Sequence, residues 1–92
     1  MDSTLEIEIG QVVKSKAGRD KDRIFIIIDI VDEQYVLVAD GDLRKLDNPK
    51  KKKVRHLAKY NIICEEVKNK INNHEKITNL LLRRELEKLG LL

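Results

Sequence analysis

The 92-residue sequence predicts a mainly β protein, with a small β-barrel, closed or nearly closed, followed by a C-terminal α-helix. Three observations predict this fold class. Short apolar segments separated by turn signals fill about 50 residues, which is typical of a small barrel. In the last third the apolar spacing changes to that of a helix. Hydrophobic residues make up 41% of the chain and aromatic residues only 3%, so we expect one small domain with an aliphatic core.

The predicted strands follow one another along the first two thirds of the chain. Residues 5–9 alternate Leu or Ile with Glu, which predicts a first strand or an extended N-terminal arm. Residues 23–31 are nearly continuous in Ile and should be buried over much of both faces. The other predicted strands are residues 11–15, 34–39, 43–46 and 54–57.

Turn residues separate these strands. Asp32-Glu33 predicts one turn, and Asp40-Gly41-Asp42 predicts another because Gly41 can adopt a positive φ without steric cost. Asn48-Pro49 interrupts the chain before four consecutive lysines. We therefore expect the lysines to lie between elements, at the start of the last predicted strand.

The C-terminal third predicts one helix. Asn73 is a suitable N-cap, and Gly90 occupies the position of a glycine that ends a helix near Leu89. Its apolar residues are Ile77, Leu80, Leu81, Leu82, Leu86 and Leu89. This helix is expected to pack on the barrel, although it could instead be offered to a partner chain. The predicted organisation is a barrel over residues 1–64 and a helical extension, packed on or projecting from it, over residues 65–92.

Positive charge is concentrated in one segment. Residues 1–43 carry a net charge of −5, residues 44–59 carry +7, and residues 60–92 carry +1. A concentrated basic patch is typical of a protein that binds a polyanion. The low aromatic content argues against a sheet that stacks several bases, so binding by shape and charge is favoured.

No segment has the character of a signal peptide or a membrane span, since the longest apolar run covers only residues 24–28. We therefore expect a cytoplasmic protein with no membrane partner. Cys64 is the only cysteine, which excludes an internal disulfide and fits a reducing compartment. Its apolar neighbours predict a small core residue rather than a catalytic thiol.

Catalysis has little support in the sequence. His56 and His74 are too far apart for a helical metal pair, and no cysteine or second histidine stands at ligand spacing. Asp40 and Asp42 could form a carboxylate pair, but a turn with two solvated acids is favoured. We expect no enzyme activity, no cofactor and no metal.

The segment of residues 10–22 carries most of the functional information. It predicts a strand that enters a short loop, where Gly18 stands among Lys16, Arg19 and Lys21. Phosphate binding needs cations and accessible backbone N–H groups, and a glycine among basic residues provides both. The alternative is a solvated hairpin loop without a ligand.

The same segment resembles a KOW motif through Gly10, Val12, Val13, Ser15, Ala17, Gly18, Arg19 and Asp20. The resemblance continues to residue 57 through residues 36–41, Arg44, Pro49-Lys50 and residues 53–57. These segments resemble a particular KOW group, which includes the eukaryote-type large-subunit ribosomal proteins fourteen-e, six-e and twenty-seven-e, and small bacterial KOW-domain RNA-binding proteins. The resemblance implies an SH3-like β-barrel that binds RNA, often ribosomal RNA.

By position, the resemblance assigns RNA contacts to two basic elements, the loop after residue 14 and the segment after residue 43. The predicted RNA-binding residues are Lys14, Lys16, Gly18, Arg19, Lys21, Arg44, Lys50, Lys51, Lys52, Lys53, Arg55 and His56. Asp20 is expected to restrain the loop. Asp22 departs from the group, where a glycine is frequent, but Asp tolerates the left-handed conformation. Residues 59–62 do not align with the group.

Two functional hypotheses follow. The first is a noncatalytic RNA-binding protein that binds rRNA or the large ribosomal subunit through its basic loops, with large-subunit proteins as possible neighbours. The second is a module that docks on a ribosomal or transcription protein through the barrel edge or the C-terminal helix. For residues 50–53, a flexible solvated loop is the alternative to a binding role.

Overall fold

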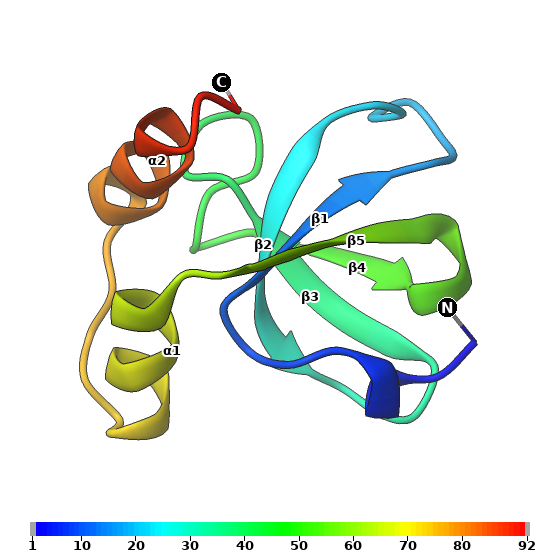
Figure 1. The fold of residues 1–92 in the computed structure, drawn as a ribbon, viewed down its shortest axis with the longest axis horizontal. Coiled ribbons are helices and arrows are strands. Elements are labelled where there is room, and N and C mark those ends of the chain that lie inside the picture. The colour runs from blue at the N-terminus through cyan, green and yellow to red at the C-terminus, as the bar shows by residue number, and fades with distance from the viewer. Residues whose placement is uncertain (1, 92) are drawn as a thin grey trace.

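The computed structural model describes residues 2–91 and shows an antiparallel sheet that curls into a small barrel, with two helices at one side (Figure 1). Its strands are β1 (Gln11–Ser15), β2 (Ile24–Ile30), β3 (Tyr35–Ala39), β4 (Lys50–Lys53) and β5 (Leu57–Ile63). The helices are α1 (Glu65–Asn72) and α2 (Asn79–Lys88), and two 3-10 turns are η1 (Thr4–Glu6) and η2 (Val54–His56). The spatial order β4-β3-β2-β1-β5 confirms the mainly β fold, which is consistent with an SH3-like barrel.

The strands divide the core into two clusters. Neighbouring residues of a strand point to opposite faces, so Val13 and Ile27 lie inside the barrel whereas Val12 and Ile26 lie on its outer face. The inner cluster consists of Ile7, Val13, Phe25, Ile27, Val36, Val38, Val54 and Leu57. The outer cluster consists of Val12, Ile26, Ala39, Cys64, Val67, Leu82 and Leu86. β2 is therefore buried on both faces in its first half, as predicted, and the helices cover the outer face.

Residues 5–9 form no strand. The Ser3 hydroxyl accepts a hydrogen bond from the Leu5 N–H, and the Glu6 carboxylate accepts one from the Asp2 N–H, so the chain turns as η1. Ile7 follows and packs in the inner cluster. Ile7 and Ile9 thus anchor an N-terminal arm to the barrel, whereas Leu5 is exposed.

The predictions for the last two strands were wrong. Residues 43–46 form a loop, because the Asp40 carboxylate accepts the N–H groups of Asp42 and Arg44, each at 2.9 Å. Residues 54–56 form η2, and the four lysines immediately before them form the strand β4. β5 includes residues 59–62, which the resemblance left unaligned.

The predicted single helix is two helices. Asn73 is the C-cap of α1 rather than an N-cap, and the N-cap of α2 is Thr78, whose hydroxyl accepts the Leu81 N–H at 3.1 Å. Gly90 follows the C-cap with φ of +70°, as predicted. α2 packs on the barrel through Leu82 and Leu86. The helical extension therefore shares a core with the barrel. The predicted ranges 1–64 and 65–92 begin at Met1 and end at Leu92, and these two residues lie outside the described residues.

Two further side chains have informative environments. Asp40 is fully buried and accepts a hydrogen bond from the Arg23 guanidinium at 2.9 Å, so the prediction of two solvated acids was wrong for Asp40 and right for Asp42. Cys64 is a buried core residue, as predicted, and burial raises the pKa of its thiol to about 11. Across residues 2–91, we find no helix with the length and apolar character that a membrane crossing requires.

Candidate nucleic-acid interface

The β1–β2 loop has a defined backbone. Gly18 has φ of +84° and Asp22 has φ of +72°, so Asp22 adopts the left-handed conformation expected of it. The Asp22 N–H donates to the Ser15 carbonyl at 2.8 Å, and the Arg23 N–H donates to the Asp20 carbonyl at 3.0 Å. These bonds close the loop while Lys16, Gly18, Arg19 and Lys21 remain exposed.

A buried ion pair fixes this loop to β4. The Lys52 ammonium lies 2.7 Å from Asp20 Oδ1 and donates to the Ala17 carbonyl at 3.1 Å. The same carboxylate oxygen accepts the Ser15 hydroxyl at 3.2 Å. Burial acts to raise the pKa of Asp20, but the hydrogen bond and charge of Lys52 outweigh it, so this pKa lies below its ordinary value. Asp20 restrains the loop, as predicted, and Lys52 joins it in that role.

Strand alternation sends the four lysines of β4 to two faces. Lys50 and Lys52 pair with Val38 and Val36, whose side chains point into the barrel. Lys51 and Lys53 belong to the opposite face, where their ammonium groups lie 4.8 and 5.9 Å from the centre of the Tyr35 ring. The alternative of a flexible solvated loop for residues 50–53 was wrong, and the lysines do not form one patch.

The first surface is a hollow of about 300 Å³ beside the β1–β2 loop, which we call the loop hollow. Its lining residues are Gly18, Arg19, Asp20, Arg44, Lys50 and Lys52. The structure thus brings together the glycine of the loop, the half-buried Arg44 of the β3–β4 loop, and Lys50 and Lys52 of β4. The two basic elements named from the sequence therefore meet in this hollow.

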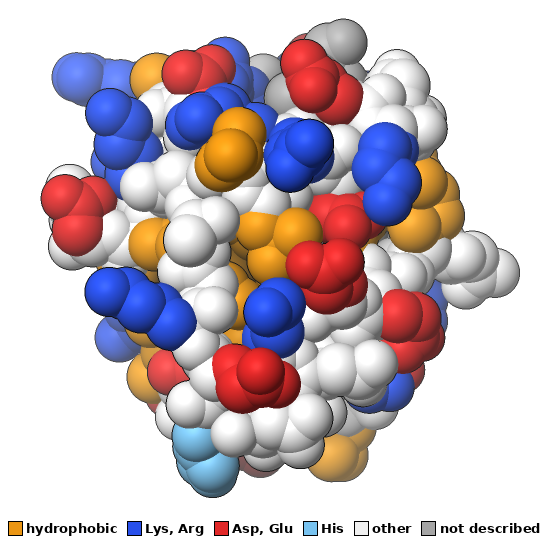
Figure 2. All heavy atoms as spheres, turned by 90° about the vertical axis from the view of Figure 1, so that its left-hand side faces the viewer, with side chains coloured by type: hydrophobic (Ala, Val, Ile, Leu, Met, Phe, Trp, Pro, Cys, Tyr) orange, Lys and Arg blue, Asp and Glu red, His pale blue; other side chains and the backbone are white. Residues whose placement is uncertain are grey.

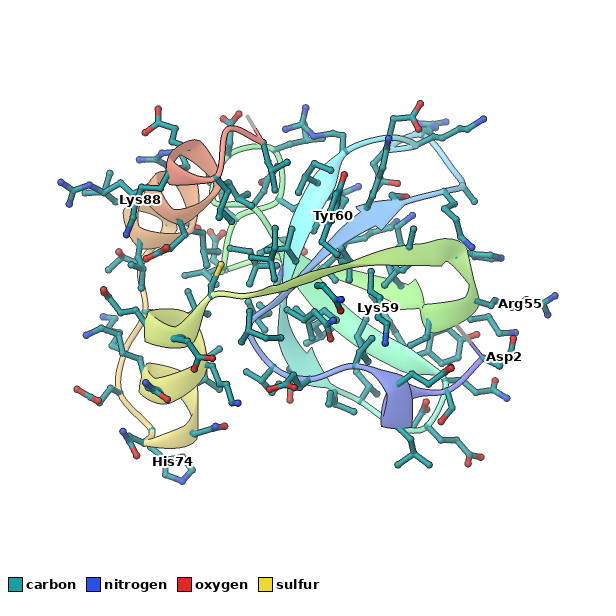
Figure 3. The ribbon with its side chains drawn as sticks, in the orientation of Figure 1. Asp2, Arg55, Lys59, Tyr60, His74 and Lys88 are labelled. Carbon is teal, nitrogen blue, oxygen red and sulfur yellow. The ribbon has the colours of Figure 1, made fainter. Side chains whose placement is uncertain are left out.

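The second surface, which we call the Tyr35 face, is formed by Tyr35, Lys51, Lys53 and Arg55. A hollow there is lined by Asp2, Gln34, Lys53 and Arg55. Arg55 and Asp2 lie at the side of the molecule opposite His74 and Lys88 (Figure 3). Tyr35 was not predicted from the sequence. The pattern that could have revealed it is an aromatic residue at the start of a strand, β3, that pairs with the lysine strand β4.

Four predicted residues belong to neither the loop hollow nor the Tyr35 face. Lys16 and His56 are exposed and adjacent, since the Lys16 N–H donates to the His56 carbonyl at 2.8 Å. Lys21 is exposed at the loop. Lys14 shares a face with Val12, and its ammonium lies 3.9 Å from the Asp22 carboxylate. Within residues 2–91, no three His, Cys, Asp or Glu side chains are grouped as metal ligands.

No family model matches the chain. The sequence is 35% identical over 71 residues to a protein of Bacillus subtilis (strain 168) named "Putative ribosome-binding protein YbzG", and the match covers 77% of this chain and 96% of the relative. The chain belongs to the YbzG family. The matched segment covers 71 of the 92 residues, so it includes residues 22–71 wherever it begins. It therefore contains β2, β3, β4 and β5 and the loop that carries Arg44. The KOW assignment itself stays a prediction.

Proposed function

We propose that this protein is a noncatalytic RNA-binding protein that associates with the ribosome through ribosomal RNA. The observation that carries the proposal is the loop hollow, where cations from three separated segments converge beside an accessible glycine. The name of the Bacillus relative, a ribosome-binding protein, supports the ribosome as the target. A ribosome-bound protein of this kind works in the cytoplasm.

The mechanism is phosphate capture on two surfaces. Arg19, Arg44 and Lys50 supply cations in the loop hollow, and the Tyr35 face supplies those of Lys51, Lys53 and Arg55. Phosphate contacts position a protein on RNA without reading its sequence, so specificity comes from the RNA shape that can reach both surfaces. Lys52 does not contact RNA but holds the loop in place.

The test is a titration with purified ribosomal RNA at three salt concentrations. If about five phosphates are neutralised, log K falls with log[salt] at a slope of roughly −3.5 to −4.5. The variants are Arg19→Gln with Lys50→Gln for the loop hollow, and Lys51→Gln with Lys53→Gln for the Tyr35 face. Each pair should flatten the slope by up to about 2.

The matched control is Lys70→Gln with Lys76→Gln, which removes the same charge from the helical side of the molecule. This pair should leave the slope as in the wild type. A wild-type slope near zero would overturn phosphate capture. Equal slopes in all three double variants would overturn the assignment of both surfaces.

A second candidate function rests on the helices. A hollow between α1 and α2 is lined by Ile77, Leu80 and Leu81 together with Glu66, Lys70 and Arg84, among others. Figure 2 shows apolar side chains in the middle of this face, ringed by charged ones. Leu80→Glu tests a protein contact there: loss of ribosome co-sedimentation with an unchanged rRNA salt slope would favour protein docking over RNA capture.

A further inference from the structure

The loop hollow contains two polar atoms whose bonding is incomplete. Among the side chains of residues 2–91, Asp20 Oδ2 and Arg44 Nε are the buried atoms without a hydrogen-bond partner, and both residues line this hollow. Asp20 is 5% exposed, and its bonds from Ser15 and Lys52 both go to Oδ1. A buried polar atom without a partner is costly, so a pair of them in one hollow points to a ligand.

The two atoms are complementary in kind. A carboxylate oxygen only accepts hydrogen bonds, whereas a guanidinium Nε–H only donates them. They do not bond to each other. A hydroxyl group both donates and accepts, so a ligand hydroxyl matches the missing partner of either atom. Arg19 and Lys50 line the same hollow and supply positive charge beside that hydroxyl.

A hydroxyl next to an anionic group is what the sugar-phosphate backbone of RNA presents, and the 2′-hydroxyl is the group that DNA lacks. We propose that the loop hollow is a ribonucleotide subsite, in which a ribose 2′-hydroxyl donates to Asp20 Oδ2 and accepts from Arg44 Nε while the neighbouring phosphate lies against Arg19 and Lys50. This inference rests on the proposed RNA binding and adds to it a chemical basis for choosing RNA over DNA.

Lys52 has a specific part in this subsite. Its bond to Oδ1 holds the Asp20 side chain in place and leaves Oδ2 without a partner in the protein. The β3–β4 loop fixes the other half, since the Arg44 N–H donates to the Asp40 carboxylate. The backbone on both sides of the subsite is therefore held before the ligand arrives. The two atoms are covered in the free protein, so side chains over the hollow must shift for the hydroxyl to reach them.

The experiment compares oligouridine of about 12 nucleotides with oligodeoxyuridine of the same length, which has the same base and lacks the 2′-hydroxyl. Both are titrated at low salt into the ¹⁵N-labelled full chain, and the Arg44 Nε–H resonance is followed by NMR. We expect oligouridine to bind at least about tenfold more tightly, because hydrogen bonds to charged groups are lost with the hydroxyl. The Arg44 resonance should shift with the RNA and much less with the DNA.

Arg44→Lys is the diagnostic variant, since it keeps the charge and removes the Nε–H; Asp20 is left unchanged because its carboxylate holds the loop. The control Arg84→Lys makes the same exchange at an exposed position of α2, outside both RNA-binding surfaces. Arg44→Lys should bring the affinity ratio close to one, whereas Arg84→Lys should not. Equal binding of both oligomers by the wild type, or a ratio unchanged in Arg44→Lys, overturns the subsite and leaves phosphate capture standing. Binding of neither oligomer at low salt overturns both proposals.

Discussion

Lys52 and Lys51 are adjacent identical residues with opposite roles. Lys52 is buried against Asp20, whereas Lys51 is exposed on the Tyr35 face. Removal of one partner of a buried ion pair leaves an uncompensated charge. We expect Lys52→Gln to lower the free energy of unfolding by roughly 2–4 kcal/mol, as measured by urea denaturation.

Lys51→Gln is the control and should change the free energy of unfolding by less than about 0.5 kcal/mol. Similar unfolding free energies for the two variants would show that the Asp20–Lys52 pair does not restrain the loop. Lys52→Gln should also weaken RNA binding, because the loop that carries Arg19 is no longer held.

The same pair makes stability depend on pH. The pKa of Asp20 is lowered in the folded protein from the ordinary 3.8, so its contribution is complete above the unfolded pKa and is lost as the pH falls through the folded pKa. In Lys52→Gln the buried Asp20 carboxylate has lost its charged partner, and protonation removes the free-energy cost of burying its charge. We expect the difference in melting temperature between wild type and Lys52→Gln to shrink as the pH falls below 3.8. A constant difference would contradict this assignment.

At the scale of single residues, the sequence predicted charge better than environment. Gly18, Arg19, Arg44 and Lys50 meet in one hollow, as expected from the two basic elements. The burial of Lys52 could not be predicted, because it depends on Asp20, which lies 32 positions away and across two strands. The aromatic partner of Lys51 and Lys53 was missed for the same reason, since only the β3–β4 register brings it there.

At the scale of elements, prediction succeeded where local pattern and tertiary pairing agree. β1, β2 and β3 are apolar segments bounded by turns, and each appears where it was predicted. β4 consists of four lysines, which carry little intrinsic preference for a strand, and it forms because β3 offers it a free edge. Lysines are also common on exposed edge strands, where they oppose pairing with other chains. Asn73 suits either end of a helix, so the break between α1 and α2 was not visible.

The β3–β4 loop depends on its contact with α2. Gly41 has φ of +79°, and a Cβ there would clash with the backbone carbonyl of Asn79. The Gly41 carbonyl also accepts a bond from Arg83 at 2.6 Å. We expect Gly41→Ala to lower the free energy of unfolding by more than the approximately 1 kcal/mol that a left-handed alanine costs by itself.

Gly90→Ala is the matched control, because Gly90 has φ of +70° and open space around it. Chemical denaturation of both variants separates backbone strain from the clash with α2. If the free energy of unfolding falls by the same amount in both variants, α2 moves away from the new Cβ without a measurable cost, and the predicted effect of the clash is wrong. Gly41→Ala should also lower RNA affinity, because the displaced loop carries Arg44.

At the scale of the molecule, the barrel and the helices share one hydrophobic cluster, so we expect them to unfold together. The outer cluster contains Val12 and Ile26 from the sheet together with Leu82 and Leu86 from α2. Leu86→Ala should cost about 2–5 kcal/mol, and amide hydrogen exchange should become faster in β1 and β2 as well as in α2. Leu80→Ala, at a half-exposed position of the same helix, should cost less than about 0.5 kcal/mol. Unchanged protection of the β1 amides in Leu86→Ala would mean that the helices unfold separately.

The alternation of β4 has a consequence for covalent chemistry. Acetic anhydride reacts with accessible amines. The Lys52 amine is buried and ion-paired with Asp20, whereas Lys51 and Lys53 face outward. Brief acylation followed by peptide mass spectrometry should find Lys51 and Lys53 modified well before Lys52. A modifying enzyme in the cell would meet the same order, so the geometry of one short strand decides which of its identical side chains can be acetylated while the protein stays folded.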